Sequence, residues 1–141
     1  MQGDNQIQFN KEAGDRVSAR YERLHGEIFN SIEQQRLRDA LSVAKSSVKT
    51  GAELLKALDY GCGSGNLTRF LIELGIYTVS ADISEGFLTL IESRFRQTGL
   101  SEGLLINGKD LSNVPDGSLD LTASYSVLHH VPDYLHVVRE M

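Results

Sequence analysis

A glycine-rich segment at residues 59–65, Asp-Tyr-Gly-Cys-Gly-Ser-Gly, has a spacing that suits ligand binding. Glycine allows the backbone to turn sharply and allows a ligand to approach without a Cβ in the way. The third glycine comes one residue earlier than in the G-x-G-x-x-G pattern of dinucleotide-binding folds. Asp59 stands two residues before the first glycine, where a carboxylate would repel a pyrophosphate and attract an ammonium or sulfonium group. The segment therefore favours a ligand with a cationic group.

Other polar residues follow the predicted strands further along the chain, namely Asp82, Asp110 and Ser124. In an open α/β sheet, ligands bind outside the carboxyl ends of the strands. A carboxylate at Asp82 can accept hydrogen bonds from both hydroxyls of a ribose. Asp82 also lies in the N-cap region of a predicted helix that Ser84 caps, and the two roles are compatible.

Apolar periodicity and turn residues predict alternating helices and strands. The predicted helices span residues 13–29, 31–50, 66–74, 84–99 and 131–141, and the predicted strands span residues 54–58, 76–81, 103–107 and 119–124. We expect the polar residues 1–10 to be loosely held and Ser31, with Gln34, to form the capping box of the second helix. This alternation predicts an α/β fold with a mainly parallel sheet and helices on both faces.

Two segments carry a resemblance to a known family. Residues 59–65 resemble the first motif of the class I S-adenosylmethionine-dependent methyltransferases, D-x-G-C-G-x-G. Residues 116–131 resemble the family's fourth-strand pattern, D-G-x-F-D-x-x-x-S-x-x-x-L-H-H-x, with Leu119 in place of the usual phenylalanine. The resemblance implies S-adenosylmethionine as cofactor and a Rossmann-like sheet in the order 3-2-1-4, with the C-terminal strands of the family missing. It also implies an N-terminal helical cap at residues 1–50 and a truncated cofactor-binding domain at residues 51–141.

The same resemblance implies roles for individual residues. Asp82 would bind the ribose and Ile83 would pack on the adenine, while Asp110 and the backbone N–H of Leu111 would pair with the adenine edge. The implied cofactor-binding residues are Tyr21, Asp59, Gly61, Cys62, Gly63, Gly65, Asp82, Ile83, Asp110, Leu111 and Ser124.

Several of these assignments have a structural alternative. Asp110 could be a solvated loop aspartate, and Tyr21 could be a core aromatic on an amphipathic helix. Tyr125 and His129 could face the methyl acceptor, but the pair His129 and His130 could equally be structural, so no catalytic base is assigned.

Composition narrows the class of protein. A net charge of −5 over 141 residues, with no sustained basic block, argues against a nucleic-acid or anionic-membrane partner. The single cysteine, Cys62, is consistent with a reducing compartment, and its small apolar side chain suits a filler of the turn better than a nucleophile. No signal-peptide or transmembrane stretch is present, so a cytoplasmic protein without a metal site is expected.

The predicted function is methyl transfer from S-adenosylmethionine to an unidentified small molecule. Two alternatives remain open: a module that binds the cofactor without turnover, and a nicotinamide oxidoreductase, which the short glycine spacing disfavours. If the sheet ends at its fourth strand, that exposed edge invites self-association.

Overall fold

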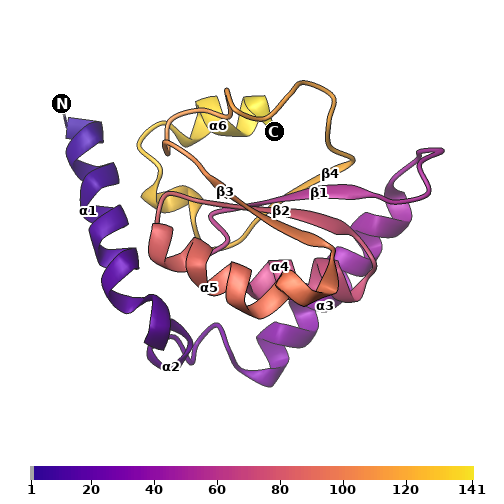
Figure 1. Cartoon of the computed structure of the whole chain (residues 1–141), viewed down its shortest axis with the longest axis horizontal. Helices are drawn as coiled ribbons and strands as arrows, with labels where there is room; N and C mark the ends of the chain where they lie inside the picture. The colour runs from indigo at the N-terminus through magenta and orange to yellow at the C-terminus, as the bar shows by residue number, and fades with distance from the viewer. Residues whose placement is uncertain (1) are drawn as a thin grey trace.

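The computed structural model describes residues 2–141, which form one four-stranded parallel sheet with helices around it (Figure 1). The strands are β1 (Lys56–Tyr60), β2 (Tyr77–Asp82), β3 (Ser101–Leu105) and β4 (Leu121–Ser124). The helices are α1 (Gln2–Val17), α2 (Tyr21–Leu24), α3 (Ser31–Ser47), α4 (Asn66–Glu73), α5 (Glu85–Phe95) and α6 (Tyr134–Glu140), with 3₁₀ turns η1 (Ser18–Arg20), η2 (Arg96–Thr98) and η3 (Leu128–His130). The strand order is β3-β2-β1-β4 and every pair is parallel, which confirms the predicted order.

Alternating residues of the central strands divide the core into two layers. Ala57 packs with apolar residues of α3 and α4, whereas Leu58 packs on the opposite face with Val137 of α6. Successive side chains of a strand point to opposite faces, so the neighbours Ala57 and Leu58 serve different layers, whereas Tyr60, two residues on, lies in the same layer as Leu58. Figure 1 shows α3, α4 and α5 on one side of the sheet and α6 on the other, which confirms the expectation of helices on both faces.

The first helix differs from the expectation. Residues 2–17 form one continuous helix, so the prediction of a loosely held segment at residues 1–10 is wrong for the described residues. The helix is polar, and contacts distant in the sequence hold it in place: Asp4 pairs with Lys109, and the Asn10 side chain donates to the carbonyl of His130. The sequence pattern of residues 1–10 did not predict this helix, because the contacts that stabilise it come from residues far along the chain.

The start of α3 also differs from the expectation. Asn30, with extended backbone dihedral angles, is the N-cap residue, and its side chain accepts a hydrogen bond from Glu33 N at 3.0 Å. Ser31, the predicted cap, is instead the first helical residue. At the start of α5 the predicted cap is confirmed, because Ser84 Oγ accepts from Phe87 N at 3.2 Å.

None of the helices between residues 2 and 141 combines the length and the apolar character that crossing a bilayer requires.

Asp59 joins β1 to α4 and β2 inside the protein. Its side chain is 2% exposed, and its Oδ2 accepts hydrogen bonds from the backbone N and the Oγ1 of Thr68 at 2.9 and 2.7 Å. Thr68 Oγ1 also lies 2.8 Å from Ser80 Oγ of β2. Burial raises the pKa of Asp59 to about 7, since a charged carboxylate is poorly solvated there.

Replacing Gly65 by alanine should destabilise the fold more than replacing Gly75. Both glycines have positive φ, +91° and +74°, which costs an alanine about 1–2 kcal/mol. A Cβ at Gly65 would also lie 2.7 Å from the side chains of Ile91 and Phe95, whereas none would lie within 4 Å at Gly75. The clash should lower the free energy of unfolding of Gly65→Ala by a further ~1–3 kcal/mol, the cost of overpacking a core. Denaturant unfolding of the two variants measures the difference. Equal losses for the two variants would contradict this account of the turn.

The buried carboxyl of Asp59 predicts a pH-dependent stability. Its pKa is higher in the folded than in the unfolded protein, so its contribution to stability is present below about pH 4 and is lost as the pH rises through about 7. Asp59→Asn keeps an acceptor oxygen without the charge. In this variant the free energy of unfolding should therefore change less between about pH 4 and 7 than in the wild type. Denaturant unfolding across that pH range measures the effect, with the exposed Asp116→Asn as control. An unchanged slope in Asp59→Asn would refute the assignment.

Candidate functional site

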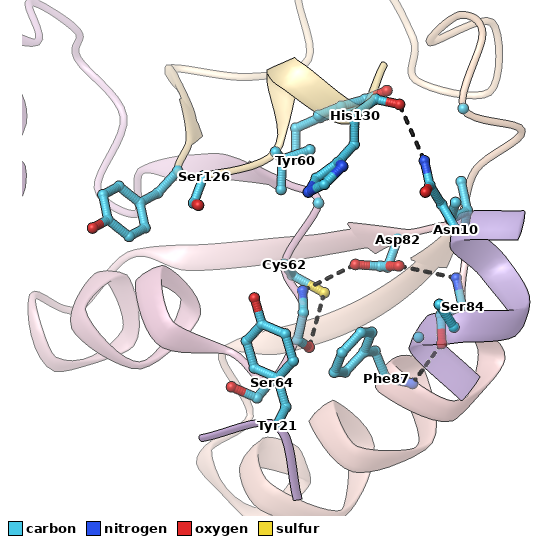
Figure 2. A pocket seen from close by; sticks show the side chains of 18 of the residues that line it. Asn10, Tyr21, Tyr60, Cys62, Ser64, Asp82, Ser84, Phe87, Ser126 and His130 are labelled. Carbon is cyan, nitrogen blue, oxygen red and sulfur yellow. Dashed lines mark hydrogen bonds between the residues drawn. The ribbon is translucent and has the colours of Figure 1, made fainter. Parts of the chain in front are cut away.

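A cavity of about 360 Å³ lies at the carboxyl ends of β1, β2 and β4, and α1 forms one of its walls (Figure 2). Its size falls in the range of small-molecule sites. The wall residues from α1 and α2 are Ile7, Phe9, Asn10, Ala13, Gly14, Val17 and Tyr21. The remaining walls come mainly from the loop after β1 (Gly61–Ser64, Asn66), the end of β2 and start of α5 (Asp82–Ser84, Phe87), and the segment after β4 (Tyr125–Val127, His130–Pro132).

The glycine loop after β1 is held by backbone hydrogen bonds. Gly61 N and Cys62 N both donate to the carbonyl of Ala81 in β2, at 2.8 and 2.9 Å. Gly63 has a φ of +50° and lines the cavity, and no heavy atom lies within 4 Å of the place where its Cβ would be. The loop therefore presents bare backbone to the cavity, as a site for close ligand approach requires.

Asp82 lies at the end of β2 with a fixed carboxylate. Its Oδ2 accepts from Gly63 N and its Oδ1 accepts from Ser84 N, both at 2.9 Å. The side chain is 8% exposed, and burial raises its pKa. Each carboxylate oxygen has a second lone pair, so the group can still accept hydrogen bonds from a ligand's hydroxyls.

Two residues on the cavity wall have buried polar atoms without a hydrogen-bond partner among residues 2–141. These atoms are Ser64 Oγ and the Oδ1 and Nδ2 of Asn66. Buried polar groups are nearly always paired, so Ser64 and Asn66 are candidates for contact with a polar ligand. Neither Ser64 nor Asn66 was among the predicted cofactor-binding residues. Their place within and directly after the glycine motif was the available signal.

Tyr21 stands on the wall within an aromatic cluster. Its ring lies 4.3 Å from His25, 5.3 Å from Phe87 and 6.3 Å from Phe29, measured between centroids. Figure 2 shows its hydroxyl pointing toward the glycine loop. Burial raises its pKa, so the hydroxyl is protonated and can donate a hydrogen bond.

Five of the predicted residues do not line the cavity: Asp59, Gly65, Asp110, Leu111 and Ser124. Asp59 points toward α4, because it lies one position before the strand end and strand side chains alternate. Gly65 is the N-cap of α4. The hydroxyl of Ser124 donates to the carbonyl of Tyr60 at 3.2 Å and so links β4 to β1.

The segment after β3 follows another path than expected. Asp110 Oδ1 accepts from the backbone N and side chain of Ser112 and from Asn107, so it stabilises its own turn, as in the loop alternative. The N–H of Leu111 donates to Glu140 of α6 at 2.6 Å. Strand β3 ends at Leu105, two residues before the predicted end. Ile106 and Gly108 line the cavity in this region instead.

The segment after β4 brings Tyr125 and His130 to the cavity but not His129. The Tyr125 hydroxyl donates to Glu33 at the start of α3. Desolvation lowers the pKa of His130, which favours its neutral form. Ser126, also on the wall, has a φ of +58°, an uncommon conformation for a residue with a Cβ that often occurs at functional sites.

Residues 2–141 contain no group of three or more His, Cys, Asp or Glu side chains that could hold a metal ion.

Comparison with known proteins agrees with this geometry. A family model described as a methyltransferase domain matches residues 58–141. The ubiquinone biosynthesis O-methyltransferase of Methylococcus capsulatus is 36% identical over 84 residues, covering 59% of this chain and 35% of that protein. The demethylmenaquinone methyltransferase of Geobacillus stearothermophilus is 30% identical over 131 residues, covering 89% of this chain and 53% of that protein. The chain thus spans about a third to a half of the length of these curated relatives.

The magnesium protoporphyrin IX methyltransferase of Synechocystis PCC 6803, solved with bound SAM, has a similar fold. The TM-score is 0.65 at 18% identity, and the match covers 93% of this chain and 66% of that one. The sheet order, the glycine loop and the family match over more than half of the sequence lead to one assignment: the chain belongs to the class I S-adenosylmethionine-dependent methyltransferase family.

Proposed function

We propose that the cavity binds S-adenosylmethionine and that the protein transfers its methyl group to an apolar, quinone-related acceptor. The observation that carries the proposal is the carboxylate of Asp82, held by Gly63 N and Ser84 N on the wall of a cavity at the carboxyl ends of the strands. A fixed acceptor at this place suits the two hydroxyls of a ribose. The family match supports the identity of the nucleoside.

The other walls suit the two ends of the cofactor. Ile83, Ile106 and Gly108 form an apolar wall next to Asp82, which suits an adenine ring. The unpaired polar atoms of Ser64 and Asn66 suit the charged amino-acid end. Both ends then find the partners that their chemistry requires, because apolar rings gain from burial and buried charges need hydrogen bonds.

The cofactor, when bound, supplies an activated methyl group on a sulfonium centre. The chain's own contribution is to bind, orient and shield. Asp82 gives the cavity a negative group that favours a cationic ligand. The helices α1 and α2 cover the cavity, and exclusion of water strengthens these electrostatic contacts.

Two observations support the acceptor class. The relatives named above act in ubiquinone biosynthesis and on demethylmenaquinone, as their names state. Apolar side chains such as Phe29, Val127 and Val131 occupy much of the wall, which suits a ring compound without charge. An acceptor hydroxyl must lose its proton, and the neutral imidazole of His130 on the same wall is able to take it.

Cofactor binding is tested with the product, S-adenosylhomocysteine, by titration calorimetry. We expect the wild-type chain to bind and Asp82→Ala to weaken binding by at least about 1.5 kcal/mol, because hydrogen bonds to the charged carboxylate are lost. Asp116→Ala, in an exposed loop away from the cavity, is the control and should bind as the wild type. Unchanged binding in Asp82→Ala, or preferential binding of NAD by the wild type, would sink the cofactor assignment.

The acceptor class is tested by methyl transfer. Protein incubated with methyl-labelled S-adenosylmethionine and chemically reduced demethylmenaquinone should place label in the organic phase, because an apolar product partitions there. The reduced quinol form is used because it carries the hydroxyls and the nucleophilic ring that the quinone lacks. A charged amine acceptor of similar size serves as the comparison. Label on the amine alone would contradict an apolar acceptor, since the cavity wall offers it few polar partners.

A further inference from the structure

Asp15 of α1 forms a contact with the start of α5, far along the chain. Its Oδ1 accepts a hydrogen bond from Ser84 Oγ at 2.6 Å and another from Gly86 N at 2.9 Å. These hydrogen bonds lower the pKa of the Asp15 carboxyl, which therefore stays ionised. A carboxylate also suits the N-terminus of a helix, where the backbone N–H groups carry partial positive charge.

Ser84 connects this contact to the cofactor site. Its hydroxyl donates to Asp15 and accepts from Phe87 N, while its backbone N–H donates to Asp82 Oδ1 at 2.9 Å. Ser84 is 1% exposed. Both carboxylates thus accept a hydrogen bond from Ser84, Asp82 from its backbone N–H and Asp15 from its hydroxyl.

The backbones of α1 and α5 approach each other closely at the same place. A Cβ at Gly14 would lie 3.0 Å from the Cβ of Ser84, and a Cβ at Gly86 would lie 3.1 Å from the Cα of Asp15. These distances are shorter than ordinary van der Waals contact, so this close approach depends on the two glycines.

Helix α1 is attached to the opposite wall of the cavity as well. Asn10 Nδ2 donates to the carbonyl of His130 at 3.1 Å, a contact drawn in Figure 2. Between Asn10 and Asp15, the residues Ala13 and Gly14 line the cavity. The helix therefore bridges the cavity, attached at Asp15 on one side and at Asn10 on the other.

We propose that Asp15 is a positioning residue of the cofactor site. Through Ser84 it fixes the turn that presents Asp82 to the ribose, and it holds α1 across the cavity once the cofactor is bound. The proposal rests on the proposed binding of S-adenosylmethionine. A role limited to capping α5 would lower the stability of the fold but would leave the response of α1 to the ligand unchanged.

The test compares three variants by calorimetry with S-adenosylhomocysteine. Asp15→Ala removes the acceptor of the buried Ser84 hydroxyl and should weaken binding about tenfold. Asp15→Asn keeps an acceptor oxygen and should remain within about threefold of the wild type. Glu12→Ala is the matched control on the same helix and should bind as the wild type, since Glu12 is exposed and its side chain accepts a hydrogen bond from the exposed Gln8.

Hydrogen exchange distinguishes the positioning role from a role limited to capping α5, because only the positioning role links the protection of α1 by the ligand to Asp15. S-adenosylhomocysteine should protect the amides of residues 7–17 and 61–65 in the wild type. In Asp15→Ala, at saturating ligand, the glycine loop should keep its protection and α1 should lose it. Equal affinity of Asp15→Ala and wild type, or unchanged protection of α1, would overturn the proposal while leaving the proposed function intact. A wild-type protein that fails to bind would overturn both.

Discussion

The structure depends on one shared carboxylate, that of Asp82. Its two oxygens bind the backbone of the glycine loop at Gly63 and the backbone of the turn before α5 at Ser84. One side chain thus connects the two loops that form part of the cavity wall. Burial makes the charged form costly and raises the pKa of Asp82, and the backbone N–H groups of Gly63, Ser84 and Ile83 partly offset that cost. The same carboxylate lines the cavity.

The second acid of the sheet, Asp59, shows how one residue type performs two tasks. Asp59 lies on the α4 face, bound to Thr68 and close to Ser80, and it supports the strand from which the glycine loop leaves. Asp82 is the last residue of its strand, where a side chain reaches the loops beyond the sheet. The position along the strand, rather than the carboxyl group itself, decides whether the side chain supports the neighbouring helix or lines the cavity.

The N-terminal helix completes the site from outside the sheet. Its own sequence is polar and gives it little tendency to fold alone, so its stability comes from contacts with the rest of the protein. Those contacts, at Asp15 and Asn10, fall on the segments that border the cavity. The contacts that hold this helix in place are therefore made with the same segments that form the cavity wall.

The sequence by itself determined the architecture. Apolar runs bounded by glycine and turn residues predicted the four strands, and their alternation with helices predicted a mainly parallel sheet. The order of the strands was predicted from the resemblance to the methyltransferase family, and the structure confirms it. The pattern of the sequence also placed Asp82 and the glycine loop at one end of the sheet, where the cavity lies, and the family resemblance added Ile83, which also lines the cavity.

Only the tertiary structure decided which polar groups reach the cavity. Strand β3 ends two residues earlier than predicted, and Asp110 and Leu111 hydrogen-bond to Ser112 and Glu140 instead of lining the cavity. The turn after β4 brings His130 to the cavity wall, but not its neighbour His129. Helix α1 and the unpaired atoms of Ser64 and Asn66 were likewise beyond local patterns. The physical reason is the same in each case: the direction of a side chain depends on where its element ends and what packs against it, and both are set by contacts between residues far apart in the chain.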